Sequence, residues 1–470
     1  MSGEPDLAVP PRTVTALAAL CSVGLLVAIP LHAQDRFTGT WNGELDAGAV
    51  QLRLVLHVEP GEEGYTAALD SPDQGAFGIE ASAVATTGDS LTVEFADVAG
   101  QYAGALDAGG TSLSGTWTQG GQVFPLMLER GEPEQVRRPQ NPEAPFPYRE
   151  EEVRFAGGSE GVELAGTLTL PGGAGPHPAA ILVSGSGPQD RNEEIFQHKP
   201  FLVLADYLTR RGIAVLRYDD RGVAASTGDF AAATTRDFAA DAEAALAYLR
   251  TRSDIDPAAI GLIGHSEGGV VAPLVASRVA IDWIVMIAGP GLPGDSILAL
   301  QVDALNEAAG MPSAQRAAAN SLQRRLMDIA VSDRDPVAAQ DEVAGLLRAE
   351  VPGLAEGQAL AQAAALTSPW MREFLRYDPR PVLRELRIPV LAVNGGNDLQ
   401  VLPGPNLAAI ESALAAAGNE DFATVELEGL NHLLQTSETG LVTEYGRIEE
   451  TIAPIALQTI GDWIEARART

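Results

Sequence analysis

Cysteine is nearly absent from this chain: Cys21 is the only one among 470 residues. It lies inside the apolar run Val14 to Leu31, which we expect to be removed from the mature protein. A chain without thiols cannot form disulfides, bind a metal through thiolates or use a cysteine nucleophile. These three kinds of chemistry are therefore excluded for the mature chain.

Positive charge is also scarce. Lysine occurs once, at Lys199, and 31 basic residues stand against 63 acidic residues, so the net charge is −32. Such a surface repels nucleic-acid phosphates and anionic lipid head groups, and we expect no nucleic acid among the partners. With 46% hydrophobic and 20% charged residues, the composition is that of a globular chain. Its length favours two or three domains.

One long hydrophobic run is present, at the N-terminus. Arg12 precedes the run Val14 to Leu31, and Leu31-His32-Ala33 forms an imperfect cleavage site. This arrangement predicts a signal peptide over residues 1–33 and export to the periplasm or the medium. The alternative is an uncleaved membrane anchor, because the run is close to spanning length. The small residue after the run favours cleavage, after which we expect no stable insertion in a membrane.

Residues 35–130 predict an all-β domain. Short alternating runs such as Leu52 to Leu56 are separated by Gly, Asp and Pro turns. Gly39-Thr40-Trp41 recurs as Gly115-Thr116-Trp117, and the first and last strands of a closed antiparallel sheet are neighbours. We therefore expect a small barrel or sandwich. His57 stands alone in this segment and is interpreted as a surface strand residue.

Residues 131–149 hold five prolines and predict a stiff linker. From 150 to 470 the pattern changes to alternating strands and helices, which predicts a mostly parallel sheet with helices on both faces. Strands are expected over 179–184, 213–217, 260–264, 283–288, 389–394 and 425–428, and helices over 198–211, 235–251, 267–278 and 447–467. Between about residues 290 and 386 the alternation of strands and helices stops, and the helical sequence there predicts an inserted cap.

Gly264-His265-Ser266-Glu267-Gly268 places one serine where an expected strand ends and an expected helix begins. A strand that turns directly into a helix brings the two backbones together, so the residues two before and two after the turn must be glycine. Gly264 and Gly268 meet this need. The pattern predicts that the Ser266 hydroxyl is exposed at the carboxyl end of the sheet as a nucleophile. The alternative is an ordinary glycine-rich turn.

A serine nucleophile needs an imidazole that takes its proton and a carboxylate that orients the imidazole. On a scaffold of this kind, the acid follows a late strand and the histidine follows the last one. Asp398 follows the expected strand 389–394, and His432 follows the strand 425–428. We therefore predict Ser266, Asp398 and His432 as a catalytic triad. The alternatives are an aspartate that bonds only to its own loop and a surface histidine.

The oxyanion of a tetrahedral intermediate needs hydrogen-bond donors. The residue after the nucleophile supplies one backbone N–H, here that of Glu267, and the loop after the expected strand 179–184 supplies another. This loop reads Ser184-Gly185-Ser186-Gly187-Pro188, and its small residues allow close approach of the backbone to a substrate. We predict the N–H of Ser186 as the second donor, with a flexible turn as the alternative.

Residues 150–470 resemble the α/β-hydrolase superfamily, in particular exported bacterial esterase-like proteins of the serine aminopeptidase-type branch. The matching stretches, in family order, are SGSGPQDRN, LRYDDRG, GHSEGG, NGGND and GLNH. The resemblance implies a Ser266 nucleophile, a His432 base, an Asp398 orienting acid and a helical cap between two strands. Asp220-Arg221-Gly222 resembles a loop that braces the site. Ser184 stands where many relatives carry histidine.

The sequence thus predicts a serine hydrolase that cleaves carboxylic esters through an acyl-enzyme. A serine peptidase acting on short peptides is the alternative, because the same triad cleaves both bonds. A non-catalytic binding module is a third interpretation, and the complete Ser, Asp and His set argues against it. No HExxH motif is present and the histidines do not pair, so we expect no cofactor and no metal. The expected partner is a small ester or a short peptide.

Overall fold

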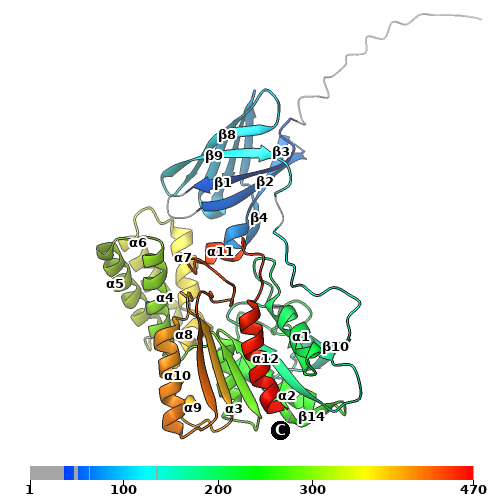
Figure 1. Ribbon diagram of the computed structural model, residues 1–470. Coiled ribbons are helices and arrows are strands. Elements are labelled where there is room, and N and C mark those ends of the chain that lie inside the picture. Colours follow the sequence, from blue (N-terminus) through cyan, green and yellow to red (C-terminus); the bar gives the residue numbers. More distant parts are fainter. Residues whose placement is uncertain (1–35, 47–50, 63, 134–135, 469–470) are drawn as a thin grey trace, which may run out of the picture.

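The structure is a computed structural model that describes residues 36–46, 51–62, 64–133 and 136–468. It contains two sheets, an antiparallel one over residues 39–130 and a mixed one that begins at residue 149 and carries helices on both faces (Figure 1). The predicted signal peptide, residues 1–33, lies outside the described residues. Among the described residues, no helix has both the length and the apolar character that a membrane span requires.

The N-terminal domain is a half-barrel of nine antiparallel strands in the order β4-β3-β2-β1-β9-β8-β7-β6-β5. The strands are β1 (Gly39–Asp46), β2 (Gln51–Gly61), β3 (Gly64–Ser71), β4 (Ala76–Glu80), β5 (Ala83–Thr87), β6 (Ser90–Phe95), β7 (Gly100–Leu106), β8 (Ser112–Gln119) and β9 (Gln122–Arg130). The first and last strands pair, with Trp41 opposite Arg130. The second Gly-Thr-Trp sequence lies on β8, so the two copies lie on the two neighbours of β9.

Alternate residues of these strands point into one apolar core, which includes Trp41, Leu56 and Tyr102. His57 points the other way and is not alone, as the sequence suggested: its Nε2 lies 2.8 Å from Oδ2 of Asp70 on the next strand. The expectation of a lone histidine was wrong because the partner is brought alongside by the pairing of β2 with β3. The His57 side chain remains 37% exposed.

The C-terminal domain is built on an eight-stranded sheet in the order β10-β11-β13-β12-β14-β15-β16-β17. The strands are β10 (Arg149–Ala156), β11 (Glu163–Leu170), β12 (His177–Val183), β13 (Ala214–Tyr218), β14 (Ile255–His265), β15 (Trp283–Ile287), β16 (Val390–Gly395) and β17 (Phe422–Leu427). β11 is antiparallel to both neighbours, and the other pairs are parallel. The expected parallel sheet is present, while β10 and β11 were not predicted.

Helices cover both faces of this sheet because its central strands are apolar on both sides: β15 is apolar throughout, and β12 is apolar after His177. α2 (Thr235–Arg250), α3 (Gly268–Ala276) and α10 (Pro403–Ala417) pack on the face that contains Ile181. α1 (Pro200–Arg210) and α12 (Pro454–Ala468) pack on the opposite face, which contains Leu182. The carboxyl ends of the parallel strands therefore form one edge between the two helical layers.

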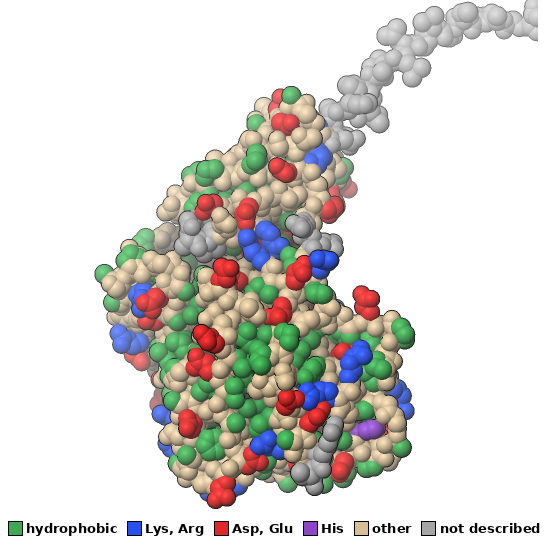
Figure 2. Space-filling view, viewed as in Figure 1, with side chains coloured by type: hydrophobic (Ala, Val, Ile, Leu, Met, Phe, Trp, Pro, Cys, Tyr) green, Lys and Arg blue, Asp and Glu red, His purple; other side chains and the backbone are tan. Residues whose placement is uncertain are grey.

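Six helices lie between β15 and β16: α4 (Gly294–Ala308), α5 (Ser313–Ala330), α6 (Pro336–Glu350), α7 (Glu356–Leu366), α8 (Pro369–Arg376) and α9 (Arg380–Leu383). α6 and α7 share a small core of their own, which includes Val343 and Ala363. Figure 1 shows α4 to α7 beside the sheet, and the short α11 (Val442–Tyr445) between the half-barrel and the C-terminal domain. On the face shown in Figure 2, acidic and basic side chains gather where the two domains meet.

Candidate active site

Ser266 lies in a sharp turn between β14 and α3. Its φ is +51°, in the left-handed region that side chains other than glycine rarely adopt, and its N–H donates to the Ile287 carbonyl at 2.8 Å. A Cβ at position 264 would lie 1.9 Å from the Gly268 carbonyl oxygen. A Cβ at position 268 would lie 2.2 Å from the Val183 carbonyl oxygen. Both glycines are thus required by close backbone approach, as the sequence pattern predicted.

Asp398 and His432 meet at the carboxyl ends of β16 and β17. Nδ1 of His432 lies 2.8 Å from Oδ2 of Asp398, and both side chains are buried. The other carboxylate oxygen, Oδ1, accepts hydrogen bonds from the backbone N–H groups of Gln400 at 2.8 Å and Val401 at 2.9 Å. Asp398 therefore bonds both to its own loop and to His432. The loop bonds fix the carboxylate in the orientation that the imidazole needs.

His265 connects the Ser266 turn to the loop that carries His432. Its Nε2 lies 3.1 Å from the His432 carbonyl oxygen, and the two imidazole ring centroids are 4.9 Å apart. The structure thus brings the turn that carries Ser266 into contact with the loop that carries His432. Within the described residues, no hydrogen bond joins the Ser266 hydroxyl to the His432 imidazole.

The loop after β12 lies against the same turn. A Cβ at position 185 would lie 3.2 Å from Cβ of Ser266, so the two segments approach closely here. The backbone N–H groups of Glu267 and Ser186, the two predicted oxyanion donors, have no acceptor among the described residues. The N–H of Gly185 is occupied, because it donates to Oε1 of Glu193 at 2.7 Å. Both predicted donors are therefore free to bind a ligand atom.

The sequence of the C-terminal domain matches a family model described as the alpha/beta hydrolase family over residues 180–444. This chain belongs to the alpha/beta hydrolase family. Esterase EstD of Thermotoga maritima is 28% identical to it over 335 residues, which cover 71% of each chain.

Two solved esterases also resemble this alpha/beta hydrolase. The Pyrococcus furiosus esterase Pf2001 matches 72% of this chain and 100% of its own, with 13% identity and a TM-score of 0.43. Est1E of Butyrivibrio proteoclasticus, solved with ferulic acid bound, matches 68% of this chain and 100% of its own, with 15% identity and a TM-score of 0.40. At these TM-scores the likeness adds nothing to the family match.

Sequence reasoning missed one pair in the site of this hydrolase. His265 is buried, and its Nδ1 lies 2.9 Å from Oε1 of Glu193, whose φ is +52°. In the sequence, His265 is only one of the residues of the turn Gly264 to Gly268, and nothing there indicates that it has a carboxylate partner. Glu193 directly follows the stretch SGSGPQDRN, which resembles the family, and this position was the only signal in the sequence that pointed to it.

The Glu267 side chain joins the Ser266 turn to the cap. Its Oε1 accepts hydrogen bonds from Oγ1 of Thr235 at 2.6 Å and from Nε1 of Trp370, on α8, at 2.8 Å. Oε2 is buried and has no partner among the described residues. Burial raises the pKa of Glu267, and the hydrogen bonds from Thr235 and Trp370 only partly oppose this shift. The neutral carboxylic acid is therefore favoured here more than in water.

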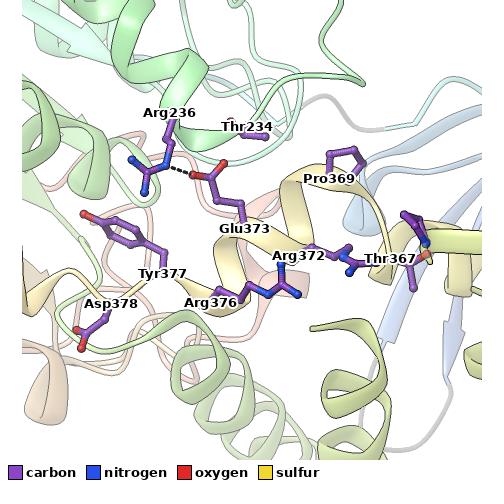
Figure 3. Close-up of a pocket in the computed structure, with 10 residues that line it drawn as sticks. Thr234, Arg236, Thr367, Pro369, Arg372, Glu373, Arg376, Tyr377 and Asp378 are labelled. Carbon is purple, nitrogen blue, oxygen red and sulfur yellow. Dashed lines mark ion pairs between the residues drawn. The ribbon is translucent and has the colours of Figure 1, made fainter. Parts of the chain in front are cut away.

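A cavity of about 780 Å³ lies between the start of α2 and the cap helix α8. Arg236 and Glu373 form an ion pair of 2.7 Å in its wall, and Tyr377 lines it beside them (Figure 3). Two further lining residues, Thr234 and Pro369, directly precede the residues that bond to Glu267. The cavity therefore lies beside the candidate site, at the junction of the cap with the main fold.

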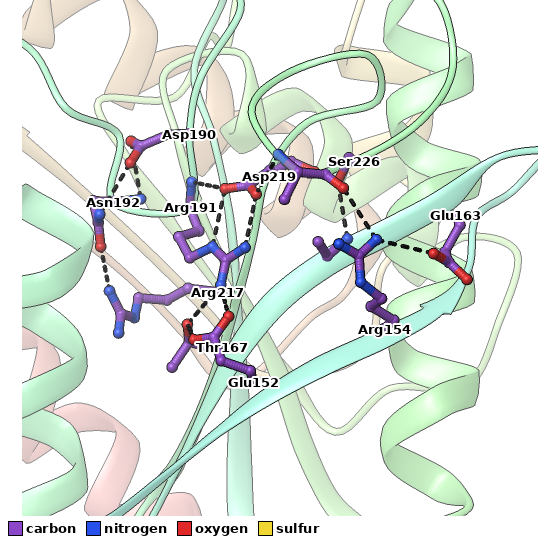
Figure 4. A network of polar contacts seen from close by, with 12 residues as sticks. Glu152, Arg154, Glu163, Thr167, Asp190, Arg191, Asn192, Arg217, Asp219 and Ser226 are labelled. Carbon is purple, nitrogen blue, oxygen red and sulfur yellow. Dashed lines mark hydrogen bonds and ion pairs between the residues drawn. The ribbon is translucent and has the colours of Figure 1, made fainter. Parts of the chain in front are cut away.

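Ion pairs fix the loops that follow β12 and β13. The guanidinium of Arg191 donates two hydrogen bonds, of 2.8 and 3.0 Å, to the Asp219 carboxylate. It also donates to Glu152 and to Thr167 (Figure 4). Asp220 accepts a hydrogen bond from the Gln189 N–H at 3.0 Å, and burial raises the pKa of Asp220 well above its usual range. These contacts fix the loop that contains Ser186, the predicted oxyanion donor.

Arg221 makes the second connection of the Asp220-Arg221-Gly222 loop. Its guanidinium binds both carboxylate oxygens of Asp241 on α2, at 2.7 and 2.8 Å.

Among the described residues, no three His, Cys, Asp or Glu side chains are placed as a set of metal ligands.

Proposed function

We propose that this alpha/beta hydrolase is a serine esterase that cleaves carboxylic esters through an acyl-enzyme. The observation that carries the proposal is the 2.8 Å contact between His432 and Asp398 beside a serine held in the sharp turn. The likeness to esterase EstD supports the substrate class. Ser266 is the proposed nucleophile, His432 the general base and Asp398 the group that orients it.

The hydrogen-bond pattern gives each group its role in the reaction. Asp398 accepts from Nδ1–H of His432, which leaves Nε2 as the basic nitrogen. Nε2 takes the Ser266 proton as Oγ attacks the ester carbonyl carbon, and the N–H groups of Glu267 and Ser186 bind the oxyanion. The alcohol leaves with the proton from His432. Water, deprotonated by the same nitrogen, then attacks the acyl-enzyme and releases the acid.

The Ser266–His432 hydrogen bond forms when substrate binds. Catalytic hydrogen bonds are often long or poorly aligned in an unliganded enzyme and tighten in the substrate complex. Since the His265 and His432 rings are 4.9 Å apart, the segments that carry Ser266 and His432 are already in contact.

An ester is favoured over a peptide for two reasons. An alkoxide leaves more readily than an amine, which must first be protonated. An aminopeptidase also needs a carboxylate that is free to bind the ammonium group of its substrate. Of the carboxyl groups next to the Ser266 turn, Glu193 is engaged by His265 and Gly185, and Glu267 is bonded at Oε1 by Thr235 and Trp370, while burial raises its pKa and so disfavours the charged form.

A fluorophosphonate probe and a panel of nitrophenyl esters and aminoacyl anilides test the proposal. Ser266→Ala is expected to abolish labelling and to lower ester turnover by about 10³-fold or more, and His432→Ala to act similarly. Asp398→Asn is expected to cost about 10²- to 10⁴-fold, because the imidazole remains but is misoriented. Ser90→Ala, at an exposed serine of the half-barrel, is the control. Normal ester turnover in folded Ser266→Ala protein, or faster turnover of anilides than of esters, contradicts the proposal.

A further inference from the structure

The candidate site contains a second histidine–carboxylate pair, which the proposed mechanism does not use. Nδ1 of His265 lies 2.9 Å from Oε1 of Glu193, 72 residues earlier in the chain. The two side chains are only 9% and 4% exposed. Burial of an ionisable pair costs free energy of folding, and such pairs concentrate at functional sites. The histidine of the pair directly precedes the proposed nucleophile, Ser266.

The pair contacts all three segments that form the site. Oε1 of Glu193 also accepts a hydrogen bond from the Gly185 N–H at 2.7 Å, in the loop of the predicted oxyanion donor. Nε2 of His265 lies 3.1 Å from the carbonyl oxygen of His432, in the loop of the proposed base. His265 itself belongs to the turn that carries Ser266. One pair therefore connects the oxyanion loop, the nucleophile and the base.

The hydrogen bonds fix where the protons of the pair lie. The His432 carbonyl can only accept, so Nε2 of His265 carries a hydrogen. Oε1 of Glu193 accepts from the Gly185 N–H and lies 2.9 Å from Nδ1 of His265, so a proton of the pair lies between Nδ1 and Oε1. Burial acts to lower the pKa of His265, but the charge and hydrogen bond of Glu193, the His432 carbonyl and the charge of Asp398 together raise it.

We propose that Glu193 and His265 are positioning residues that hold the oxyanion loop, Ser266 and His432 in their mutual arrangement; this inference rests on the proposed function. If either partner is removed, the Gly185 N–H or the His432 carbonyl loses a hydrogen bond, and its loop shifts relative to Ser266. A displacement of about 1 Å in an active site lowers turnover by about 10²-fold. No proton transfer to the substrate is assigned to the pair.

Glu193→Ala and His265→Ala, which remove the bonding groups, test the inference in the full chain. Each is expected to lower kcat by about 10- to 100-fold with little change in KM, because the loops are displaced while the substrate pocket remains. The double variant is expected to lose about as much as either single variant, because the two residues act as one unit. Titration with a fluorophosphonate counts the reactive sites, so turnover is expressed per labelled site and partial unfolding does not affect it.

The pH profile of kcat/KM separates positioning from a purely structural role. His265→Ala leaves Glu193 without its histidine partner, in a site where the charges of Asp398 and Asp220 also act on the pair. The negative charge that the histidine no longer offsets favours the protonated base, so the acid limb of kcat/KM moves to higher pH. The Glu193→Ala/His265→Ala double variant, which also removes the carboxylate, is expected to move the limb back.

His57→Ala is the matched control, because it removes a histidine–carboxylate contact of 2.8 Å in the half-barrel and is expected to leave kcat, KM and the acid limb unchanged. Turnover per labelled site within about twofold of the starting protein in both site variants, with an unmoved acid limb, overturns the inference. If Ser266→Ala stays active, the proposed function itself fails. If Ser266→Ala is inactive while both site variants are normal, only the positioning role fails.

Discussion

Asp73 of the half-barrel and Arg447 of the C-terminal domain form an ion pair, with Oδ2 2.9 Å from Nη2, although 374 residues separate them. The Asp73 side chain is fully buried and also binds Arg53 of its own domain. Arg447 lies two residues after Tyr445, whose hydroxyl bonds to Gln400 at 3.2 Å in the Asp398 loop. The half-barrel is therefore docked next to the loop that holds the proposed catalytic acid (Figure 1).

Asp73→Ala is expected to destabilise this docking. Burial acts to raise the pKa of Asp73, but hydrogen bonds from Arg53 and Arg447 outweigh it and hold the pKa below its usual range. Removal of the carboxylate leaves two arginines without their shared partner, at a cost of about 3 kcal/mol. Thermal unfolding followed by circular dichroism should show an earlier transition. Asp89→Ala, which removes an exposed ion pair with Arg36, should unfold like the starting protein, and equal effects of both variants would contradict this account.

Gly264→Ala is expected to abolish ester turnover in protein that is otherwise folded. The added Cβ would lie 1.9 Å from the Gly268 carbonyl oxygen, so the turn must open and Ser266 must move away from the oxyanion donors. A loss of about 10²-fold or more in kcat/KM is expected. Gly345→Ala on α6 is the control, because its Cβ meets no atom within 4 Å and alanine is the better helix former by about 1 kcal/mol. Normal kinetics of Gly264→Ala would show that the turn tolerates a side chain.

Glu267→Gln is expected to stabilise the protein at alkaline pH. Burial raises the pKa of Glu267, so the folded state holds this proton more tightly than the unfolded state. The resulting stability is complete below the unfolded pKa and is lost as the pH rises through the folded pKa. Glutamine keeps an acceptor for Thr235 and Trp370 without the charge, so the gain in unfolding temperature should grow from pH 4 to pH 8. Glu267→Ala, which removes the acceptor, should unfold earlier at every pH; a pH-independent difference for Glu267→Gln would contradict the prediction.

His198 is expected to make the fold sensitive to acid. Burial lowers the pKa of His198 to about 4, and the Tyr445 carbonyl only partly opposes the shift. The neutral ring contributes stability above the unfolded pKa of 6.5, and this contribution is lost as the pH falls towards 4, a change on the order of 3 kcal/mol. His198→Gln can still bond to Thr451 and Tyr445, so its stability should depend less on pH in this window. Equal slopes of unfolding free energy against pH in both proteins would contradict the assignment.

Several features of this protein follow from short stretches of sequence. The turn at Ser266 was predictable because the requirement for Gly264 comes from the backbone of Gly268, only four residues later, although the requirement for Gly268 comes from Val183 on the neighbouring strand. The position of Asp398 followed from β16, whose apolar run Val390 to Val393 is buried, and that of His432 from β17, a strand that alternates apolar and polar residues and is only partly buried. The roles of the three residues, and export through the segment 1–33, stay predictions. By contrast, β10 begins with Arg149 and three glutamates, a pattern that does not indicate a strand.

Tertiary structure alone decided the contacts between distant residues. Glu193 meets His265 across 72 residues, and Trp370 of the cap meets Glu267 across 103. No local pattern marks such partners, because a side-chain hydrogen bond depends on where the chain path brings each segment and not on its neighbours in sequence. The choice of a half-barrel over a closed barrel or sandwich was decided in the same way. A closed sheet would require β4 and β5, the two edge strands, to pair with each other. In the described residues, β4 pairs only with β3 and β5 only with β6, so the sheet stays open.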